Sequence, residues 1–242
     1  MFDTYYELSA AWKQLRHDHD LAVREVACVG APRTLLCVEV GDFSAPCIAL
    51  ASGVHGDERS GPRALFELVA RDVLDMRFSY RIWPCMNPTG YDNGTRQSAE
   101  GVDLNRTFGR GGGSPEAKAI LTATRDRRFL LSLDLHEDLD ATGFYCYSYG
   151  DHGWAHDACN ALQSRHLPLE EDSIRTPDSA REIEQLGGFS YSLALARRGM
   201  PRVGTLEAPG KAKIRDRIAM LEAAVLASLT AKLLTPPPAK EC

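Results

Sequence analysis

The chain has 242 residues, of which 44% are hydrophobic and 25% charged, and its formal net charge is −5. This length suits one large α/β domain or two small ones, and the absence of a break in composition favours one domain over residues 1–234. The even mixture of acids and bases lacks the basic footprint of a nucleic-acid-binding protein, and no window holds the roughly 20 apolar residues that span a membrane.

The sequence predicts helices and strands that alternate along the chain. Helices are expected at 3–18, 60–74, 115–126, 153–165, 187–199 and 211–234. Strands are expected at 21–30, 33–41, 47–54, 80–86, 130–135, 143–150 and 202–210. The first two strands flank Gly30-Ala31-Pro32 and indicate a β-hairpin, whereas the apolar run CIALASGV indicates a strand buried on both faces. This alternation predicts an α/β sandwich.

Three short motifs predict where helices begin and where the chain turns. Ser60-Gly61-Pro62 predicts a helix start with Ser60 as the capping hydroxyl, and Asn87-Pro88-Thr89-Gly90 predicts a turn. A glycine-rich stretch precedes Ser114, which is expected to cap a helix that begins at Pro115. We exclude a phosphate-binding loop there, because the Lys-Ser/Thr pair after the last glycine is missing and no strand directly precedes the glycines.

The cysteines and the two ends of the chain bear on the cellular compartment. The chain has seven cysteines without a C-x-x-C pair, which argues against a cysteine-based zinc site. Cys28, Cys37, Cys47 and Cys85 fall in expected strands and are interpreted as small buried thiols. The first twenty residues lack the basic and apolar regions of a signal peptide, so we expect a reducing, cytoplasmic compartment. Residues 235–242 are expected to form a disordered tail.

Polar side chains gather where the predicted strands end. His55, Asn87, His136 and Glu207 lie at or just past the ends of four strands. In open α/β sheets, ligands bind beyond the carboxyl ends of the strands. We therefore expect these side chains to converge on one site, although each of them taken singly could equally be structural.

Zinc in a hydrolase commonly takes three protein ligands and leaves a fourth position for water. His55 and Glu58 are separated by Gly56 and Asp57, which allow a tight turn, and His136 can supply the third ligand. Glu207 is a candidate base for the proton of the attacking water. His152 and His156 have the spacing of a helical zinc pair but lack the adjacent glutamate of H-E-x-x-H, so a helix-start face is favoured for them. His17, His19 and His166 have no evident partners.

One set of motifs resembles the zinc metallocarboxypeptidases, the carboxypeptidase A-like family. The set comprises His55-Gly-Asp-Glu58, Asn87-Pro-Thr-Gly-Tyr91, Arg96, Gly101-Val-Asp-Leu-Asn105-Arg106, His136 and Glu207, in the order of that family. The H-G-D-E form and the short chain are similar to its bacterial branches related to the succinylglutamate desuccinylase/aspartoacylase group. The resemblance implies a single domain with a mixed, mostly parallel sheet of about eight strands sandwiched between helices.

The resemblance also implies roles for individual residues. His55, Glu58 and His136 would bind one Zn²⁺ per chain, and Glu207 would be the general base and then the acid. Arg96 would stabilise the oxyanion.

Asn105 and Arg106 would hold the free carboxylate of the substrate, as implied by the same resemblance. The family's Asn-Arg-Asn run is Asn-Arg-Thr here, with Thr107. The tyrosine that closes over the substrate is assigned to Tyr191, although a core or surface tyrosine is an equal alternative.

Three functions are compatible with these residues. The first is a carboxypeptidase that hydrolyses the peptide bond next to a free C-terminal carboxylate. The second is a deacylase of N-acyl amino acids, as in succinylglutamate desuccinylase and aspartoacylase, or an enzyme that trims cell-wall peptides. The third is a zinc-binding module without turnover, against which the intact Glu207 argues. The preferred terminal side chain is open: Arg175, Arg181, Arg197 and Arg202 could favour an acidic one, but arginines there are mostly solvated.

Overall fold

Eight strands form one mixed sheet in the computed structural model, which describes residues 2–109, 113–177 and 187–234. The strands are β1 (Leu21–Val26), β2 (Leu35–Val40), β3 (Cys47–Ser52), β4 (Ser79–Trp83), β5 (Phe129–Asp138), β6 (Phe144–Gly150), β7 (Leu169–Arg175) and β8 (Arg202–Pro209). Their order in the sheet is β1-β2-β4-β3-β5-β8-β6-β7. The central pairs β4–β3, β3–β5 and β5–β8 are parallel, as is β6–β7, while the pairs β1–β2, β2–β4 and β8–β6 are antiparallel. The expected single α/β domain with a mixed sheet is confirmed.

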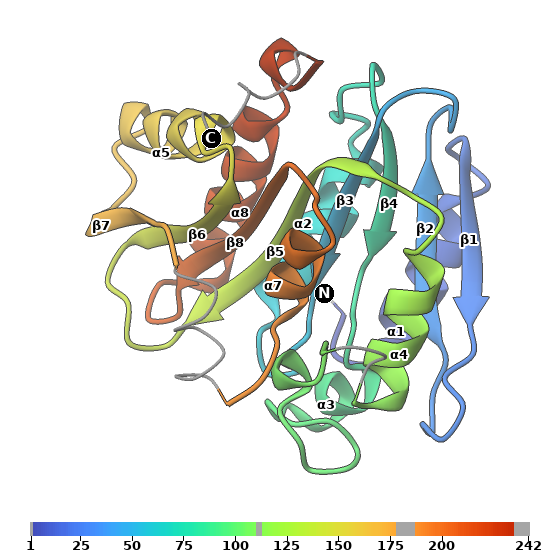
Figure 1. Ribbon diagram of the computed structural model, residues 1–242. Helices are drawn as coiled ribbons and strands as arrows, with labels where there is room; N and C mark the ends of the chain where they lie inside the picture. The colour runs from blue at the N-terminus through green and yellow to red at the C-terminus, as the bar shows by residue number, and fades with distance from the viewer. Residues whose placement is uncertain (1, 110–112, 178–186, 235–242) are drawn as a thin grey trace.

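Helices cover both faces of the sheet (Figure 1). The α-helices are α1 (Tyr5–Leu15), α2 (Ser60–Ala70), α3 (Pro88–Asn93), α4 (Pro115–Ala123), α5 (Gly153–Ser164), α7 (Tyr191–Arg197) and α8 (Ile214–Ser228), and two 3-10 helices are η1 (Leu104–Arg106) and η2 (Ala231–Leu234). One apolar core joins α1, α2, α5 and α8 to one face, and a second core joins α4 and α7 to the other. No helix in the described part of the chain is long and apolar enough to cross a membrane.

Alternation along the strands decides which side chains reach the site. Leu131, Leu133 and Leu135 of β5 belong to the core beneath α2 and α8. Successive strand side chains point to opposite faces. Asp134 and His136 therefore point to the face covered by α4 and α7, and the site is built on that face.

Several elements differ from the sequence prediction. Ser60 is the first residue of α2 and makes no capping bond; instead its N–H donates to Glu137 Oε1 at 2.6 Å, so a carboxylate from β5 stabilises the positive end of the helix. Asn87 does not begin a simple turn but caps α3, where its side chain accepts the N–H of Gly90 at 2.9 Å. The expected cap of α4 by Ser114 is confirmed.

The strand β7 was not predicted, and the last helix is shorter than expected. β7 has the sequence LEEDSIR and pairs only with β6 at the edge of the sheet, so it lacks the apolar signal of a central strand. The expected helix at 211–234 ends at Ser228 and is followed by η2. Cys28 and Cys85 are buried just outside the strands, whereas Cys37 and Cys47 lie within them. The expected tail at 235–242 lies outside the described residues.

Candidate metal centre and catalytic pocket

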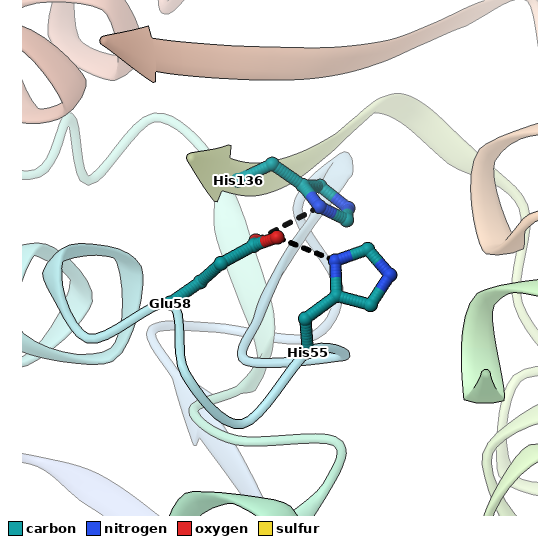
Figure 2. A group of neighbouring side chains, drawn as sticks. All are labelled: His55, Glu58 and His136. Atoms are coloured by element: carbon teal, nitrogen blue, oxygen red, sulfur yellow. Dashed lines mark hydrogen bonds and ion pairs between the residues drawn. The ribbon is translucent and has the colours of Figure 1, made fainter. Parts of the chain in front are cut away.

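His55, Glu58 and His136 converge at the carboxyl ends of β3 and β5 (Figure 2). His55 Nδ1 lies 2.5 Å from Glu58 Oε1, and His136 Nδ1 lies 3.0 Å from Glu58 Oε2. One ligand atom from each residue lies within 4.8 Å of the others, and all three side chains are buried. These three residues form the only group of this kind that the described residues contain.

The turn that carries His55 and Glu58 packs closely against the backbone of α3, the helix that follows β4. A Cβ added to Gly56 would lie 1.9 Å from the backbone carbon of Gly90, so only glycine fits at this approach. Asn87 reinforces the contact, because its N–H donates to Gly53 O at 2.8 Å and its side-chain amide donates to Arg96 O at 3.2 Å. Asn87 is fully buried and does not line the cavity. It therefore stabilises the backbone around the site and does not contact a substrate.

Each histidine faces Glu58 with Nδ1 and contacts a second carboxylate with Nε2. His55 Nε2 lies 3.3 Å from Asp103 Oδ1, and His136 Nε2 lies 2.9 Å from Asp134 Oδ2. A carboxylate on the outer nitrogen fixes the orientation of an imidazole whose other nitrogen binds a metal. Neither Asp103 nor Asp134 was predicted from the sequence, although Asp134 precedes His136 by two residues on a strand and therefore shares its face.

The ionisation of the three side chains is linked, because each histidine lies beside the carboxylate of Glu58. Burial opposes a charge on His55, but its hydrogen bonds with Asp103 and Glu58 raise its pKa above the ordinary value. Burial likewise opposes a charge on His136, and the carboxylates of Asp134 and Glu58 raise its pKa. Burial alone would raise the pKa of Glu58, but the imidazoles of His136 and His55 lower it to about 2. Two imidazole nitrogens and one carboxylate, with supporting carboxylates behind them, are a donor set that fits zinc.

A cavity of about 810 Å³ opens beside this group and contains most of the expected site residues. It is lined by His55, Glu58, His136, Arg96, Asn105, Arg106 and Glu207. Glu207 on β8 lies opposite His136 in the strand register. Burial raises the pKa of the Glu207 carboxyl to about 8, with Glu58 adding to the shift and His136 opposing it. Glu207 is therefore able to exchange a proton near neutral pH.

Asp103 holds both arginines of the pocket beside the histidine. Arg96 Nε and Nη2 donate to Asp103 Oδ2 at 3.1 and 2.9 Å, and Arg96 Nη1 lies 3.2 Å from His55 Nδ1. Arg106 Nη2 lies 3.9 Å from the same oxygen of Asp103. Asn105 is fixed by its Oδ1, which accepts the N–H of Tyr191 at 2.9 Å. Asp103 thus faces two guanidinium groups, and Glu58 Oε1 also lies 3.7 Å from Nη1 of Arg96.

The structure places Tyr191, the residue assigned to close over the substrate, outside the cavity. Its side chain is 0% exposed, packs edge-on against Phe108 at 5.4 Å between ring centroids, and does not line the cavity. The tyrosines that do line it are Tyr145, Tyr147 and Tyr149, which alternate along β6 and so share one face. Tyr191 supports the site through the backbone N–H that it donates to Asn105 Oδ1.

The arginines that could favour an acidic terminal side chain are Arg175, Arg181, Arg197 and Arg202, and none of the three described ones lines the cavity. Arg175 lies over the Tyr145 ring at 3.6 Å, and Arg197 lies 5.6 Å from the Phe189 ring. Arg202 pairs with Asp151 at 2.8 Å. Arg181 lies outside the described residues.

His152, the residue before α5, belongs to no metal group in the described residues, and its Nδ1 lies 2.9 Å from Ser148 Oγ on β6. The helix-start alternative favoured for this histidine therefore agrees with its place at the N-terminal boundary of that helix.

The buried His-Glu-His group at the carboxyl edge of a helix-covered mixed sheet is characteristic of the metal-dependent hydrolases of the carboxypeptidase and desuccinylase/aspartoacylase superfamily. Residues 44–195 match the family model of the succinylglutamate desuccinylase/aspartoacylase catalytic domain. The chain belongs to this family, and the resemblance that the motifs indicated is confirmed.

Individual relatives agree with this placement. Carboxypeptidase SOL1 of Arabidopsis thaliana is 33% identical over 111 residues, which cover 38% of this chain and 23% of that protein, so the match spans about a quarter of the relative's length. A metallopeptidase candidate from Shewanella amazonensis has a similar fold, with a TM-score of 0.76 at 20% identity over 96% of this chain and 93% of that one. Carboxypeptidase A from Helicoverpa armigera gives a TM-score of 0.72 at 18% identity, over 95% and 74% of the two chains.

Proposed function

We propose that this protein is a zinc-dependent metallocarboxypeptidase that hydrolyses the peptide bond next to a free C-terminal carboxylate. One observation carries the proposal: a metal-type ligand group, a carboxyl group that titrates near neutral pH and two arginines share one cavity of about 810 Å³. A hydrolase of this class needs all three, and the cavity brings them together from β3, β5, β8 and the loop around η1.

His55, Glu58 and His136 would hold the zinc ion, which when bound supplies the Lewis acidity that polarises water and the scissile carbonyl. Glu207 takes a proton from the attacking water as its oxygen adds to the carbonyl carbon. Glu207 then donates that proton to the leaving nitrogen as the carbon–nitrogen bond breaks. The products are a shortened acid and a free amino acid. Asp103 and Asp134 keep the two imidazoles in the orientation that leaves Nδ1 directed at Glu58.

Arg96 is the group that stabilises the oxyanion formed during this addition. Its Nη1 lies 3.2 Å from His55 Nδ1, so its positive charge lies beside the ligand group, and its other nitrogens are fixed by Asp103. A positioned donor of this kind contributes about 3–4 kcal/mol to a transition state.

Asn105 and Arg106 bind the free carboxylate of the substrate. A guanidinium presents a planar fork of N–H donors that matches a carboxylate. Arg106 donates to the backbone oxygen of Asn105 at 2.9 Å, which orders its side chain before the substrate arrives. Arg106 Nη2 lies 3.9 Å from Asp103 Oδ2, beyond hydrogen-bond distance, so this nitrogen is able to donate to a substrate carboxylate.

A deacylase of N-acyl amino acids is the second candidate, because the matching family model is that of the desuccinylase/aspartoacylase catalytic domain. The charges of the cavity favour a peptide over a succinylated substrate. Asp57 and Asp138 line the cavity, and no cationic side chain of the described residues lies within 4.0 Å of either carboxylate. The third acid there, Glu137, pairs with Arg217. An anionic acyl group such as succinyl would meet like charge from Asp57 and Asp138.

We include in this proposal the cytoplasmic compartment and the absence of nucleic-acid and membrane partners that the sequence predicts. Its support is the free, buried state of all six described cysteines and the lack of a basic footprint in the composition. Fractionation of native cells tests the compartment: recovery of the protein with a secreted or membrane fraction would contradict it.

A substrate panel tests the function. Peptides with free and with amidated C-termini are compared with N-acetyl and N-succinyl amino acids, with zinc present and after chelation. Zinc-dependent release of a C-terminal amino acid from free peptides alone supports the carboxypeptidase. Cleavage of acyl amino acids alone would replace it with the deacylase, and one bound zinc without turnover of any substrate would leave a binding module.

A further inference from the structure

A second, smaller cavity lies at the end of the sheet opposite the metal centre, where the strands β5 and β8 begin. It has a volume of about 280 Å³ and is lined by Thr124, Arg125, Arg127, Arg128, Arg198 and Met200. These residues belong to the turn between α4 and β5 and the turn between α7 and β8, which precede the amino ends of two neighbouring parallel strands. His136 comes seven residues after Phe129, the first residue of β5, so the two cavities are about 23 Å apart along that strand.

The charge in this cavity is unbalanced. Four of its six lining residues are arginines and none is acidic, although the whole chain has 33 acids and 28 bases. Over residues 2–109, 113–177 and 187–234, no carboxylate oxygen lies within 4.0 Å of any of these four guanidinium groups. Asp126 stands in the same turn, but its carboxylate lies 3.3 Å from Arg81 instead.

Backbone oxygens hold three of the four guanidinium groups in place. Arg127 donates to Phe43 O at 3.1 Å and also lies over the Phe43 ring at 4.8 Å. Arg128 donates to Gly199 O at 3.2 Å. These bonds use part of each donor fork and restrict the side chain, so less conformational entropy remains to be lost when an anion binds.

Arg198 connects the turn between α7 and β8 to the end of α4. It donates to Leu121 O and to Thr124 Oγ1, both at 3.2 Å. Burial lowers its pKa, and the neighbouring charge of Arg125 lowers it further. Like charges gathered around a cavity repel one another, and a bound anion would relieve that repulsion.

We infer that this arginine-lined cavity is an anion-binding site for a phosphate group, carried as pyrophosphate or as a phosphate monoester. A guanidinium fork matches the oxygens of a phosphate, and a group of two or more negative charges offsets the cluster better than a single carboxylate does. This site is separate from the catalytic cavity and is independent of the proposed hydrolysis.

Thermal unfolding and calorimetric titration of the zinc-loaded protein test this site. Pyrophosphate and glycerol 3-phosphate are titrated separately in chloride buffer of matched ionic strength, and the zinc content is measured after each titration because pyrophosphate binds zinc. We expect a saturable rise in Tm with at least one of the two ligands. The tighter ligand tells whether the site takes a polyphosphate or a phosphate monoester.

The double variant Arg125→Gln/Arg198→Gln should bind that ligand at least about tenfold more weakly, since it loses two positive charges and their charge-assisted hydrogen bonds. Arg215→Gln, at an exposed arginine of α8, is the matched control and should bind as the unchanged protein does. Peptidase activity without added phosphate should be the same in all three proteins. No saturable shift with either ligand, or a shift that survives in the double variant, would overturn the assignment.

Discussion

Asp134 and His136 lie on the same face of β5, with Asp134 Oδ2 2.9 Å from His136 Nε2. The contact directs the other ring nitrogen of His136 toward Glu58, 3.0 Å away. Asp134 itself is 1% exposed and never reaches the cavity, so it acts on the metal centre only through the histidine.

Replacement of Asp134 by Asn should therefore weaken zinc binding without removing a ligand. Loss of such a supporting carboxylate typically lowers metal affinity by about 10–100-fold. Competition titration against a chromogenic chelator measures the change. Asp140→Asn, at an exposed position two residues beyond the strand, is the control and should bind zinc normally. Equal affinity in Asp134→Asn and the unchanged protein would show that the contact does not support the metal.

Zinc binding should weaken as the pH falls. In the metal-free protein the pKa of His55 and the pKa of His136 are both raised above the ordinary value, because carboxylates outweigh the effect of burial. Zinc must displace those protons, so its affinity should fall by up to about tenfold per pH unit for each imidazole that is protonated. Calorimetry in buffers of different ionisation enthalpy counts the released protons. An affinity that is flat from pH 8 to pH 6 would contradict the protonated state.

Arg106→Ala should mainly weaken capture of the free carboxylate. The loss of a charge-assisted pair should lower kcat/KM for free peptides by about 10–100-fold, chiefly by raising KM. Amidated peptides carry no terminal charge, and their slower cleavage should change little. Steady-state kinetics on matched free and amidated peptides separate the two cases. An equal loss on both substrates would mean that Arg106 supports the pocket rather than the carboxylate.

The two carboxylates of Asp57 and Asp138 should favour a positive charge on the acyl side of the scissile bond. Peptides that differ only there, with lysine, norleucine or glutamate, should rank in that order of kcat/KM, with about tenfold between the extremes for partly solvated charges. Asp57→Asn and Asp138→Asn should reduce the ratio between lysine and glutamate substrates. Equal kcat/KM for glutamate and lysine substrates would contradict this preference and would restore the anionic deacylase substrates as candidates.

Much of the fold was predictable because apolar periodicity reflects burial. The run at 47–54 contains β3, and the predicted strand at 130–135 lies within β5. β7 was missed because an edge strand rich in acidic residues lacks that periodicity. The end of the last helix was misplaced because tertiary packing decides where such a helix breaks: Leu229 and Leu233 are both buried on either side of the break.

The candidate site was predictable where residues have a recognisable spacing, as His55 and Glu58 do. The supporting carboxylates were not, because Asp103 contacts a histidine 48 positions earlier in the chain, and only the folded structure brings the two together. The burial of Tyr191 was not predictable, because the sequence of so short a helix does not reveal which of its sides faces the core. The arginine cavity was likewise invisible, since its residues come from turns that are about 70 residues apart.

The central claim is that Glu207 moves the proton for a hydrolysis at the His55–Glu58–His136 centre. Glu207→Gln keeps the size and hydrogen-bonding capacity of the side chain but cannot accept that proton. The most direct measurement is zinc content together with single-turnover hydrolysis of a free-carboxylate peptide by this variant. We predict one zinc per chain and a rate that is lower by about 10²–10⁴-fold. Full zinc occupancy with an undiminished rate would contradict the account.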